Sequence, residues 1–376
     1  MHIENNSYLT KYFDIDKQRF VDFDKHKLCK IKLTDFELDS HIYNSRFMSQ
    51  RPDNYKCVLK NIVPIPPRSS WSFLNKTFTE TKKNIVRSKK KYSLEDLITF
   101  CNRAKKLTKN KIAIELSGGL DTGIIIGIAK ELNLQPLLIG GISDKYEFRT
   151  ERYIQNLIAE QFDEVKFIPE SNALPFSSLK STPFHVVPNK SSLHYYLNSL
   201  TSDWAKLNNI KYIFNGIGFD SVLVDPVLDE TFLNNKANLF DNWPNDYVFM
   251  PNATCYVNIA EIYTIRKILL SMRYLQPLDT KKLWARKYFK NYIPIELSQY
   301  QYKASFAANY AEGLKVNKDE IFEICINVNK FCNNIKRLSP DKIIKLIDSV
   351  EEFNHKDEFE LLSCLSFINW INSFIK

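Results

Sequence analysis

The stretch KIAIELSGGLDTGIIIGIAKEL, residues 111–132, joins a short apolar run to a helical pattern through a glycine-rich turn. It contains four of the nine glycines in a chain of 376 residues. The apolar run 112–116 predicts a buried strand, and 124–132 predicts a helix. A glycine turn between the two leaves backbone N–H groups uncovered at the positive end of a helix, where they attract an anion. This stretch therefore predicts a strand–turn–helix unit with an anion-binding turn.

Short apolar runs and helical patterns alternate on both sides of this stretch. A helix is predicted from Ser93, which forms a variant capping box with Asp96 three residues later. Further strands and helices are predicted at residues 135–140, 149–161, 164–168, 192–207 and 211–216. Parallel strands need long crossover connections, and helices of this length supply them. The sequence therefore predicts an α/β fold with a parallel, doubly wound sheet.

Different patterns flank this α/β segment. Residues 1–91 contain short β-like runs such as 56–65, broken by prolines, and predict a small, mostly β region. The basic stretch 82–91 is interpreted as a linker. Beyond about Tyr256 the chain is predicted to be helical. We therefore expect two domains, the β region 1–91 and a larger domain 92–376 with a helical C-terminal half.

The composition argues against several classes of protein. Lysine and arginine outnumber the acidic residues by 52 to 43, a net charge of +9, but they are scattered, so no nucleic-acid partner is expected. No run of 18 apolar residues occurs and the N-terminal residues are polar, so no membrane partner is expected and a cytoplasmic protein is predicted. Seven cysteines without a CxxC pair favour reduced core residues over a zinc site or a disulfide framework.

Glycines and aspartates recur after two of the predicted strands. Gly118 and Gly119 follow the first strand, and the second cluster, NGIGFD at 215–220, follows another. Asp121 and Asp220 would repel a bound phosphate unless a cation lies between them, and Mg²⁺ binds through carboxylates and phosphate oxygens together. The sequence therefore predicts a site for ATP and Mg²⁺ at the carboxyl ends of the strands. The predicted nucleotide-binding residues are Ser117, Gly118, Gly119, Leu120, Asp121, Thr122, Gly140, Asn215 and Gly216, with Asp121 and Asp220 as metal ligands.

The SGGLDT turn resembles the pyrophosphate loop of the N-type ATP pyrophosphatases, and in particular the synthetase domain of the asparagine synthetase family. Three further elements of that family have counterparts in the same order, at 216–220, 273–279 and 293–306. The resemblance implies an adenine nucleotide α-hydrolase-like fold. It also implies that two aspartates, here Asp121 and Asp220, hold Mg²⁺ on the phosphates. Lys303 in the last element is implied to be catalytic, acting on the phosphates or on the developing charge.

Two departures from that family narrow the expected reaction. Its glutamine-hydrolysing members begin with a nucleophilic cysteine directly after the initiator methionine, whereas this chain has His2. Its asparagine-forming members carry a glutamate where this chain has Ile217. β-Lactam synthetases and lasso-peptide macrolactam synthetases also lack this cysteine and this glutamate, and the chain resembles them in that respect. Those enzymes adenylate a carboxylate with ATP, and an amine of the substrate attacks it while AMP is released.

We therefore expect an ATP-dependent ligase that forms an amide bond in a peptide or small-molecule substrate, with macrolactam formation in ribosomal peptide biosynthesis as the leading hypothesis. A precursor-processing protease is a further expected partner. The alternatives are an ammonia-dependent asparagine synthetase, a β-lactam-synthetase-like ligase and an RNA-modifying enzyme with the same loop. A non-catalytic scaffold is disfavoured because Ser117, Asp121 and Asp220 are intact. His185 and His194 are interpreted as solvated loop residues, and Arg273 as a structural partner of Asp279.

Overall fold

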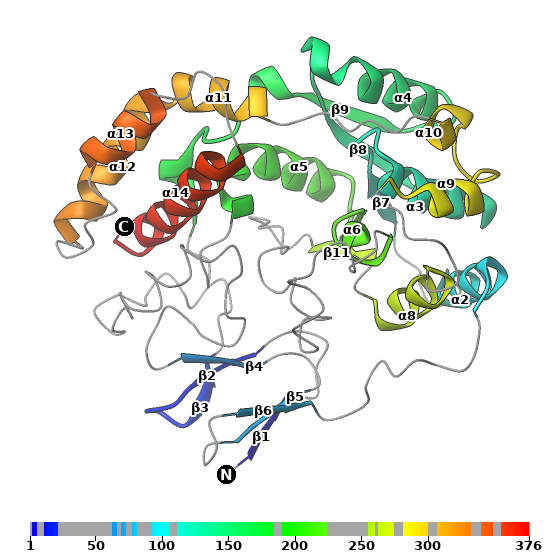
Figure 1. Ribbon diagram of the computed structural model, residues 1–376, viewed down its shortest axis with the longest axis horizontal. Helices are drawn as coiled ribbons and strands as arrows, with labels where there is room; N and C mark the ends of the chain where they lie inside the picture. Colours follow the sequence, from blue (N-terminus) through cyan, green and yellow to red (C-terminus); the bar gives the residue numbers. More distant parts are fainter. Residues whose placement is uncertain are drawn as a thin grey trace. The chain divides into compact units, whose positions relative to one another are not determined.

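The computed structural model contains two compact units, each assembled from separate segments of the chain (Figure 1). The terminal unit consists of Met1–Val86, Ser178–Leu193 and Lys315–Lys376, and the sheet unit consists of Arg87–Ser177 and His194–Leu314. The structure describes residues 2–5, 11–21, 62–65, 69–72, 77–80, 92–105, 111–183, 190–223, 255–259, 262–273, 281–299, 307–331, 340–348 and 355–375. The two units are defined by contacts between residues. The two domains expected from the sequence, 1–91 and 92–376, have other bounds and remain a prediction.

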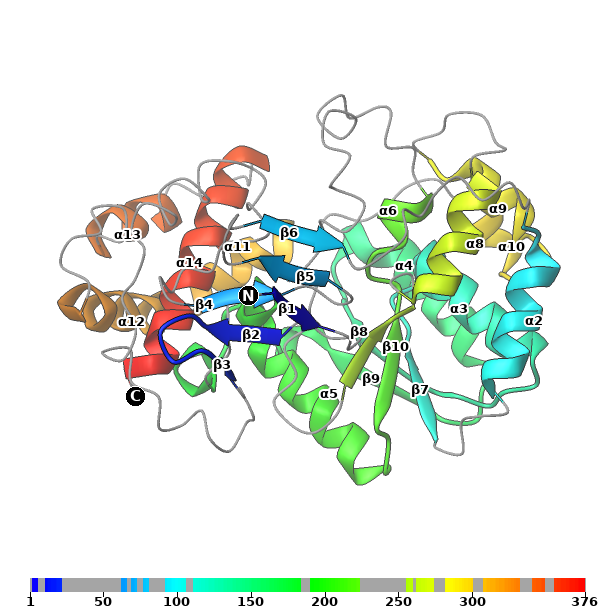
Figure 2. The same ribbon diagram turned by 90° about the horizontal axis from the view of Figure 1, so that it is seen from below.

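The sheet unit is built on five parallel strands. They are β7 (Ile112–Glu115), β8 (Leu137–Ile142), β9 (Val165–Pro169), β10 (Tyr212–Asn215) and β11 (Cys255–Asn258). Their order in the sheet is β11-β10-β7-β8-β9, and β10 lies between β11 and β7 (Figure 2). The chain therefore moves outward from β7 to β9 and then returns to the other side of β7. The predicted parallel α/β fold is confirmed.

The return of the chain creates a switch point between β7 and β10, where open α/β sheets bind their ligands at the carboxyl ends of the strands. Ile114 of β7 is paired with Phe214 of β10. Leu116 and Gly216, each two residues further on, therefore leave the sheet at the same level. Both glycine turns predicted from the sequence begin at this edge of the sheet.

Helices cover both faces of the sheet because side chains in a strand alternate between its faces. Ile114 and Leu138 pack with α3 and α4 in the larger core, whereas Ala113 and Ile139 pack with α5 in a smaller one. The helices that carry residues of the sheet unit are α2 (Leu94–Lys105), α3 (Leu120–Glu131), α4 (Arg149–Ala159), α5 (Tyr195–Leu207), α6 (Phe219–Leu223), α8 (Tyr263–Arg273), α9 (Leu283–Tyr288), α10 (Ile295–Gln299) and α11 (Ala307–Val316).

Some predicted boundaries were wrong. The chain beyond Tyr256 was expected to be helical, but residues 255–258 form β11, which pairs in parallel with β10. No glycine or proline separates these residues from the helical pattern that follows, so only the pairing with β10 reveals the strand. Helix α3 begins at Leu120 rather than at 124, directly after the glycine turn. Helix α5 begins at Tyr195, after a 3₁₀ turn, Lys190–His194.

The terminal unit combines β-sheets from the N-terminal region with helices from the C-terminal region. Its antiparallel sheets have the orders β1-β5-β6 and β3-β2-β4. The strands are β1 (His2–Asn5), β2 (Lys11–Asp14), β3 (Arg19–Val21), β4 (Ile62–Ile65), β5 (Ser69–Ser72) and β6 (Thr77–Glu80), and the helices are α12 (Lys318–Phe331), α13 (Pro340–Asp348) and α14 (His355–Ile375). The small β region and the helical C-terminal part agree with the sequence prediction. Within the described ranges, none of the helices has the length and apolar character needed to cross a membrane.

Candidate nucleotide site

The turn between β7 and α3 depends on two adjacent glycines. Gly118 has φ +76°, in the left-handed region that favours glycine. A Cβ at this position would also lie 2.4 Å from the backbone oxygen of Glu151 in α4. Gly119 is the N-cap residue of α3, and it contributes no side chain that could cover the first N–H groups of the helix. The turn therefore presents backbone donors at a helix N-terminus, as the sequence predicted.

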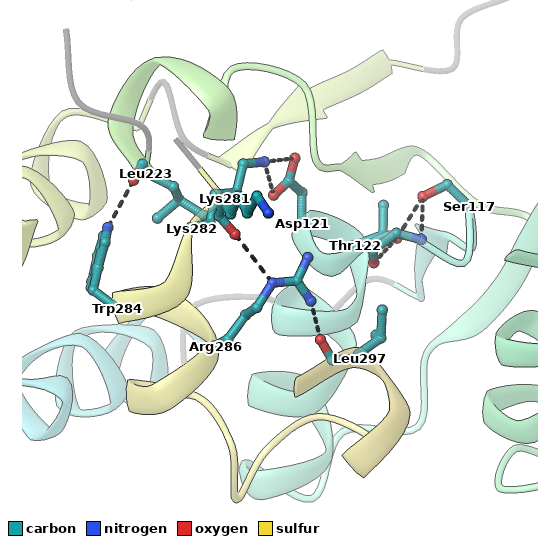
Figure 3. Close-up of polar contacts among 10 residues, drawn as sticks. Ser117, Asp121, Thr122, Leu223, Lys281, Lys282, Trp284, Arg286 and Leu297 are labelled. Atoms are coloured by element: carbon teal, nitrogen blue, oxygen red, sulfur yellow. Dashed lines mark hydrogen bonds and ion pairs between the residues drawn. The ribbon is translucent and has the colours of Figure 1, made fainter. Parts of the chain in front are cut away.

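The hydroxyl groups of two residues, Ser117 and Thr122, form hydrogen bonds within the turn (Figure 3). The backbone N–H of Gly119 donates to Ser117 Oγ at 3.2 Å. Thr122 Oγ1 donates to the Gly119 carbonyl oxygen at 3.3 Å. The two hydroxyl oxygens are 2.8 Å apart, and either hydroxyl can donate to the other. Ser117 and Thr122 thus fix the conformation of the loop.

The carboxylate of Asp121, in the first turn of α3, is bound by a lysine from a distant segment. Lys282 Nζ lies 2.7 Å from Asp121 Oδ1 and 2.8 Å from Oδ2 (Figure 3). The two side chains are only 13% and 19% exposed. Lys282 has φ +57° and directly precedes α9. The predicted metal ligand therefore carries a cationic partner that the sequence pattern did not reveal.

The second glycine turn lies against the first. A Cβ at Gly216 would stand 2.8 Å from the Cβ of Asp121 and 3.2 Å from the backbone nitrogen of Thr122. Asn215, which is fully buried, accepts the N–H of Ile217 through Oδ1 at 2.9 Å and so shapes this turn. The backbone of Asp220 belongs to α6, which starts just after the turn. Strands β7 and β10 thus bring together two motifs that are about 100 residues apart in the sequence.

The remaining predicted binding residues have different surroundings. Leu120 is buried in the larger core, so its side chain serves packing and only its backbone faces the turn. Gly140 allows close approach of β8 to β7, since a Cβ there would lie 2.1 Å from the Leu116 oxygen. Lys303 and His185 lie outside the described residues. Arg273 is buried at the end of α8, and its expected partner Asp279 lies outside the described residues.

The interpretation of His194 as a solvated loop residue was wrong. Its Nε2 lies 2.9 Å from the hydroxyl of Tyr310 in α11, and the two rings meet edge to face. Burial lowers the pKa of His194 to about 4 because the charged imidazolium loses its hydration. His194 is therefore a neutral packing residue that helps to hold α11 against the start of α5.

Glu115, the last residue of β7, is a site feature that the sequence reading missed. Burial raises the pKa of its carboxyl group to about 7. It lines a cavity of about 40 Å³ together with Ile139, Gly140, Gly141, Leu197, Asn198 and Thr201. This cavity lies between the sheet and α5, on the sheet face opposite to α3. In the sequence, the sign of this buried carboxyl group is a single glutamate inside the apolar run 112–116.

One carboxylate group among the described residues, that of Asp121, lies next to both glycine turns and fits a magnesium nucleotide. Among them, no three His, Cys, Asp or Glu side chains come together as a metal-binding group. Mg²⁺ commonly uses one or two carboxylates and completes its shell with water and substrate phosphates. Asp121 supplies one such carboxylate next to a turn that can bind the phosphates. The donor set therefore fits a metal ion that arrives with its nucleotide.

Comparisons with known proteins add little to this description. Neither the models of known families nor the curated protein sequences give a match to the chain. Among solved structures, it is similar to a U34-tRNA thiolase from Methanococcus maripaludis, determined with its 4Fe–4S cluster. The sequences are 14% identical, the match covers 69% of this chain and 82% of that chain, and the TM-score is 0.28. At this level of similarity, neither the reaction nor the cluster of that enzyme is transferred to this chain.

Proposed function

We propose that the chain is an ATP-dependent enzyme that cleaves ATP between the α- and β-phosphates and forms an amide bond. The observation that carries the proposal is the contact of the two glycine turns, where Gly216 lies against Asp121 at the switch point of a parallel sheet. The resemblance of SGGLDT to a pyrophosphate loop gives this contact its chemical meaning. Neither motif alone would distinguish a nucleotide site from an ordinary strand–helix turn.

The chain's own groups divide the task of binding the leaving pyrophosphate. The N–H groups at the start of α3 and the Ser117 hydroxyl bind phosphate oxygens, and the helix dipole stabilises their negative charge. Asp121 and Asp220 would hold Mg²⁺, which supplies electrostatic stabilisation of the charge that develops on the phosphates. Because the donors are fixed before the substrate arrives, little reorganisation is needed during the reaction.

The proposed reaction balances as two displacements. A carboxylate oxygen of the substrate bonds to the α-phosphorus, and the bond from that phosphorus to the bridging oxygen breaks, so pyrophosphate leaves. An amine nitrogen then bonds to the activated carbonyl carbon, AMP leaves with the former carboxylate oxygen, and the nitrogen loses a proton. By resemblance, the cation that stabilises the tetrahedral oxyanion is Lys303. The substrate class we propose is a peptide whose own amine closes a macrolactam.

Product analysis with ATP labelled in the adenine ring and at the γ-phosphate tests the reaction. Purified protein is incubated with Mg²⁺, and candidate carboxylates are screened by exchange of labelled pyrophosphate into ATP. We expect AMP and pyrophosphate, and we expect Asp121→Asn to abolish both while Glu164→Gln, at an exposed carboxylate, retains them. ADP and phosphate as the only products would overturn the proposal. AMP transferred to RNA would assign the chain to the RNA-modifying alternative instead.

A further inference from the structure

The most unusual charged contact in the described part of the sheet unit is the pair between Asp121 and Lys282. The ammonium group contacts both carboxylate oxygens, at 2.7 and 2.8 Å. Both side chains are largely shielded from water, so this pair is screened less than a surface salt bridge. The lysine comes from a segment 161 residues away in the sequence. A long-range contact of this kind fixes the start of α9 against the anion-binding turn.

The backbone of Lys282 has a conformation that is unfavourable for a lysine. Its φ and ψ of +57° and +32° are left-handed, a conformation that costs a residue with a Cβ roughly 1–2 kcal/mol. Glycine or asparagine would adopt it more easily. Strained residues of this kind cluster where the side chain has a task at a binding site. The strain at Lys282 is compatible with such a task, because it directs the ammonium group to the phosphate turn.

We propose that Lys282 is a pyrophosphate-binding residue that neutralises Asp121 until the nucleotide is bound. This inference rests on the proposed function and deepens it. Lys282 and Mg²⁺ need the same carboxylate, and two cations at one carboxylate repel each other. Phosphate oxygens remove this conflict, because they accept the ammonium group while Asp121 turns to the metal ion. Lys282 therefore moves from Asp121 to the phosphates of the leaving group.

This exchange predicts two opposite effects of removing the charge. Pyrophosphate or ATP loses a charge-assisted hydrogen bond, so its binding becomes weaker. A divalent metal ion without nucleotide loses a competitor for Asp121, so its binding becomes tighter. A lysine that only supports the fold would weaken both, because a distorted site binds neither ligand well. The opposite signs therefore separate a binding role from a structural one.

The experiment measures binding to the full-length protein and its variant Lys282→Gln. Calorimetry gives the affinity for ATP and for pyrophosphate, each with Mg²⁺, and electron paramagnetic resonance gives the affinity for Mn²⁺ alone. We expect pyrophosphate to bind roughly 10- to 100-fold more weakly to Lys282→Gln. We expect Mn²⁺ alone to bind more tightly. The matched control is Lys281→Gln, which removes the neighbouring exposed lysine and should change neither affinity more than about 2-fold.

A second comparison covers the case in which Lys282→Gln does not fold because Asp121 is left without its cation. Pyrophosphate affinity is then compared between Asp121→Asn and the double variant Asp121→Asn/Lys282→Gln, in which no unpaired carboxylate remains. Equal affinity in that comparison, or unchanged pyrophosphate binding by Lys282→Gln, overturns the role of Lys282. If the wild-type protein binds pyrophosphate with the expected dependence on Lys282 but never releases AMP, the proposed reaction fails and the binding role stands.

Discussion

Gln155 of α4 joins the end of β7 to the end of β8. Its Nε2 donates to the carbonyl oxygen of Leu116 at 2.9 Å and to that of Gly141 at 2.8 Å. The side chain is buried, so these two hydrogen bonds lie out of competition with water. Leu116 directly precedes the anion-binding turn, and Gln155 therefore fixes the level at which this turn leaves the sheet.

Gln155→Leu is expected to lower the free energy of unfolding by about 1–3 kcal/mol, because it leaves buried carbonyl groups without this donor. It should also weaken ATP binding, since the start of the turn loses its support. Urea unfolding and calorimetry measure the two effects, with Asn156→Leu, the same replacement at the adjacent exposed position, as the control. Unchanged stability would mean that water replaces the amide at no cost.

Glu115 makes the stability of the protein depend on pH. Its folded pKa of about 7 lies above the ordinary value of 4.5, so the folded state binds the proton more tightly than the unfolded state. The contribution is fully favourable below pH 4.5 and is lost as the pH rises through 7. We expect this loss to be about 1–3 kcal/mol, reduced by the partial exposure of the side chain.

Glu115→Gln should remove that part of the pH dependence and make the protein more stable than the wild type at pH 8. Thermal unfolding between pH 5 and 8 measures the effect, and Glu164→Gln at an exposed position is the control. If the two variants have the same pH profile, Glu115 ionises normally in the folded protein.

Lys303→Ala is expected to slow product formation by a factor on the order of 10²–10³, the usual effect of losing one preorganised charge. Lys303→Arg should not restore the rate, because the planar guanidinium group differs in reach and geometry. ATP affinity should change little, since in the proposed site the glycine turns, Lys282 and Mg²⁺ would provide most phosphate contacts. Pyrophosphate exchange and product formation are measured in parallel. Product at the wild-type rate would show that the resemblance around Lys303, outside the described residues, is coincidental.

Glutamine should not serve as a nitrogen donor. We expect this because none of the cysteines lies in the first 28 residues of the sequence, the region that holds the nucleophile in the glutamine-hydrolysing enzymes that the chain resembles. Burial raises the pKa of Cys101 to about 11 and of Cys325 to about 12, so these thiols stay protonated and unreactive at neutral pH. Incubation of the purified protein with glutamine should release glutamate only at the background rate. Clear release, abolished by a thiol-modifying reagent, would identify a cysteine that performs this reaction.

The sequence was sufficient for the features that are encoded locally. Four of the five parallel strands follow from apolar runs between helical patterns, because crossover connections impose that alternation. The fifth, β11, is followed by a helical pattern without a glycine or proline between them, and its edge position next to β10 is a property of the folded chain. Gly118 could likewise be recognised, since a tight turn into a helix needs a residue that tolerates positive φ.

Long-range partners could not be predicted in the same way. Lys282 is one lysine among many in the sequence, and only the fold brings it to Asp121. Glu115 lies inside the apolar run 112–116, and its raised pKa depends on burial next to α5. His194 was misjudged because its solvent shield, Tyr310, belongs to a helix 116 residues away. These properties arise from tertiary contacts, and only Glu115, a carboxylate inside an apolar run, has a sign in the local pattern.

The terminal unit is assembled from three segments that are far apart in the sequence, and this has a consequence for synthesis on the ribosome. The side-chain amide of Asn369 in α14 donates to the hydroxyls of Thr182 and Ser192, which lie 187 and 177 residues earlier. At translation rates of about 5–20 residues per second, the earlier segment waits roughly 10–40 s for its partner. Leu179, a buried residue in a turn of that segment that contacts α12 and α14, remains uncovered during this interval. Nascent chains stalled before α14 should therefore bind chaperones, and release of the last helix should end that binding.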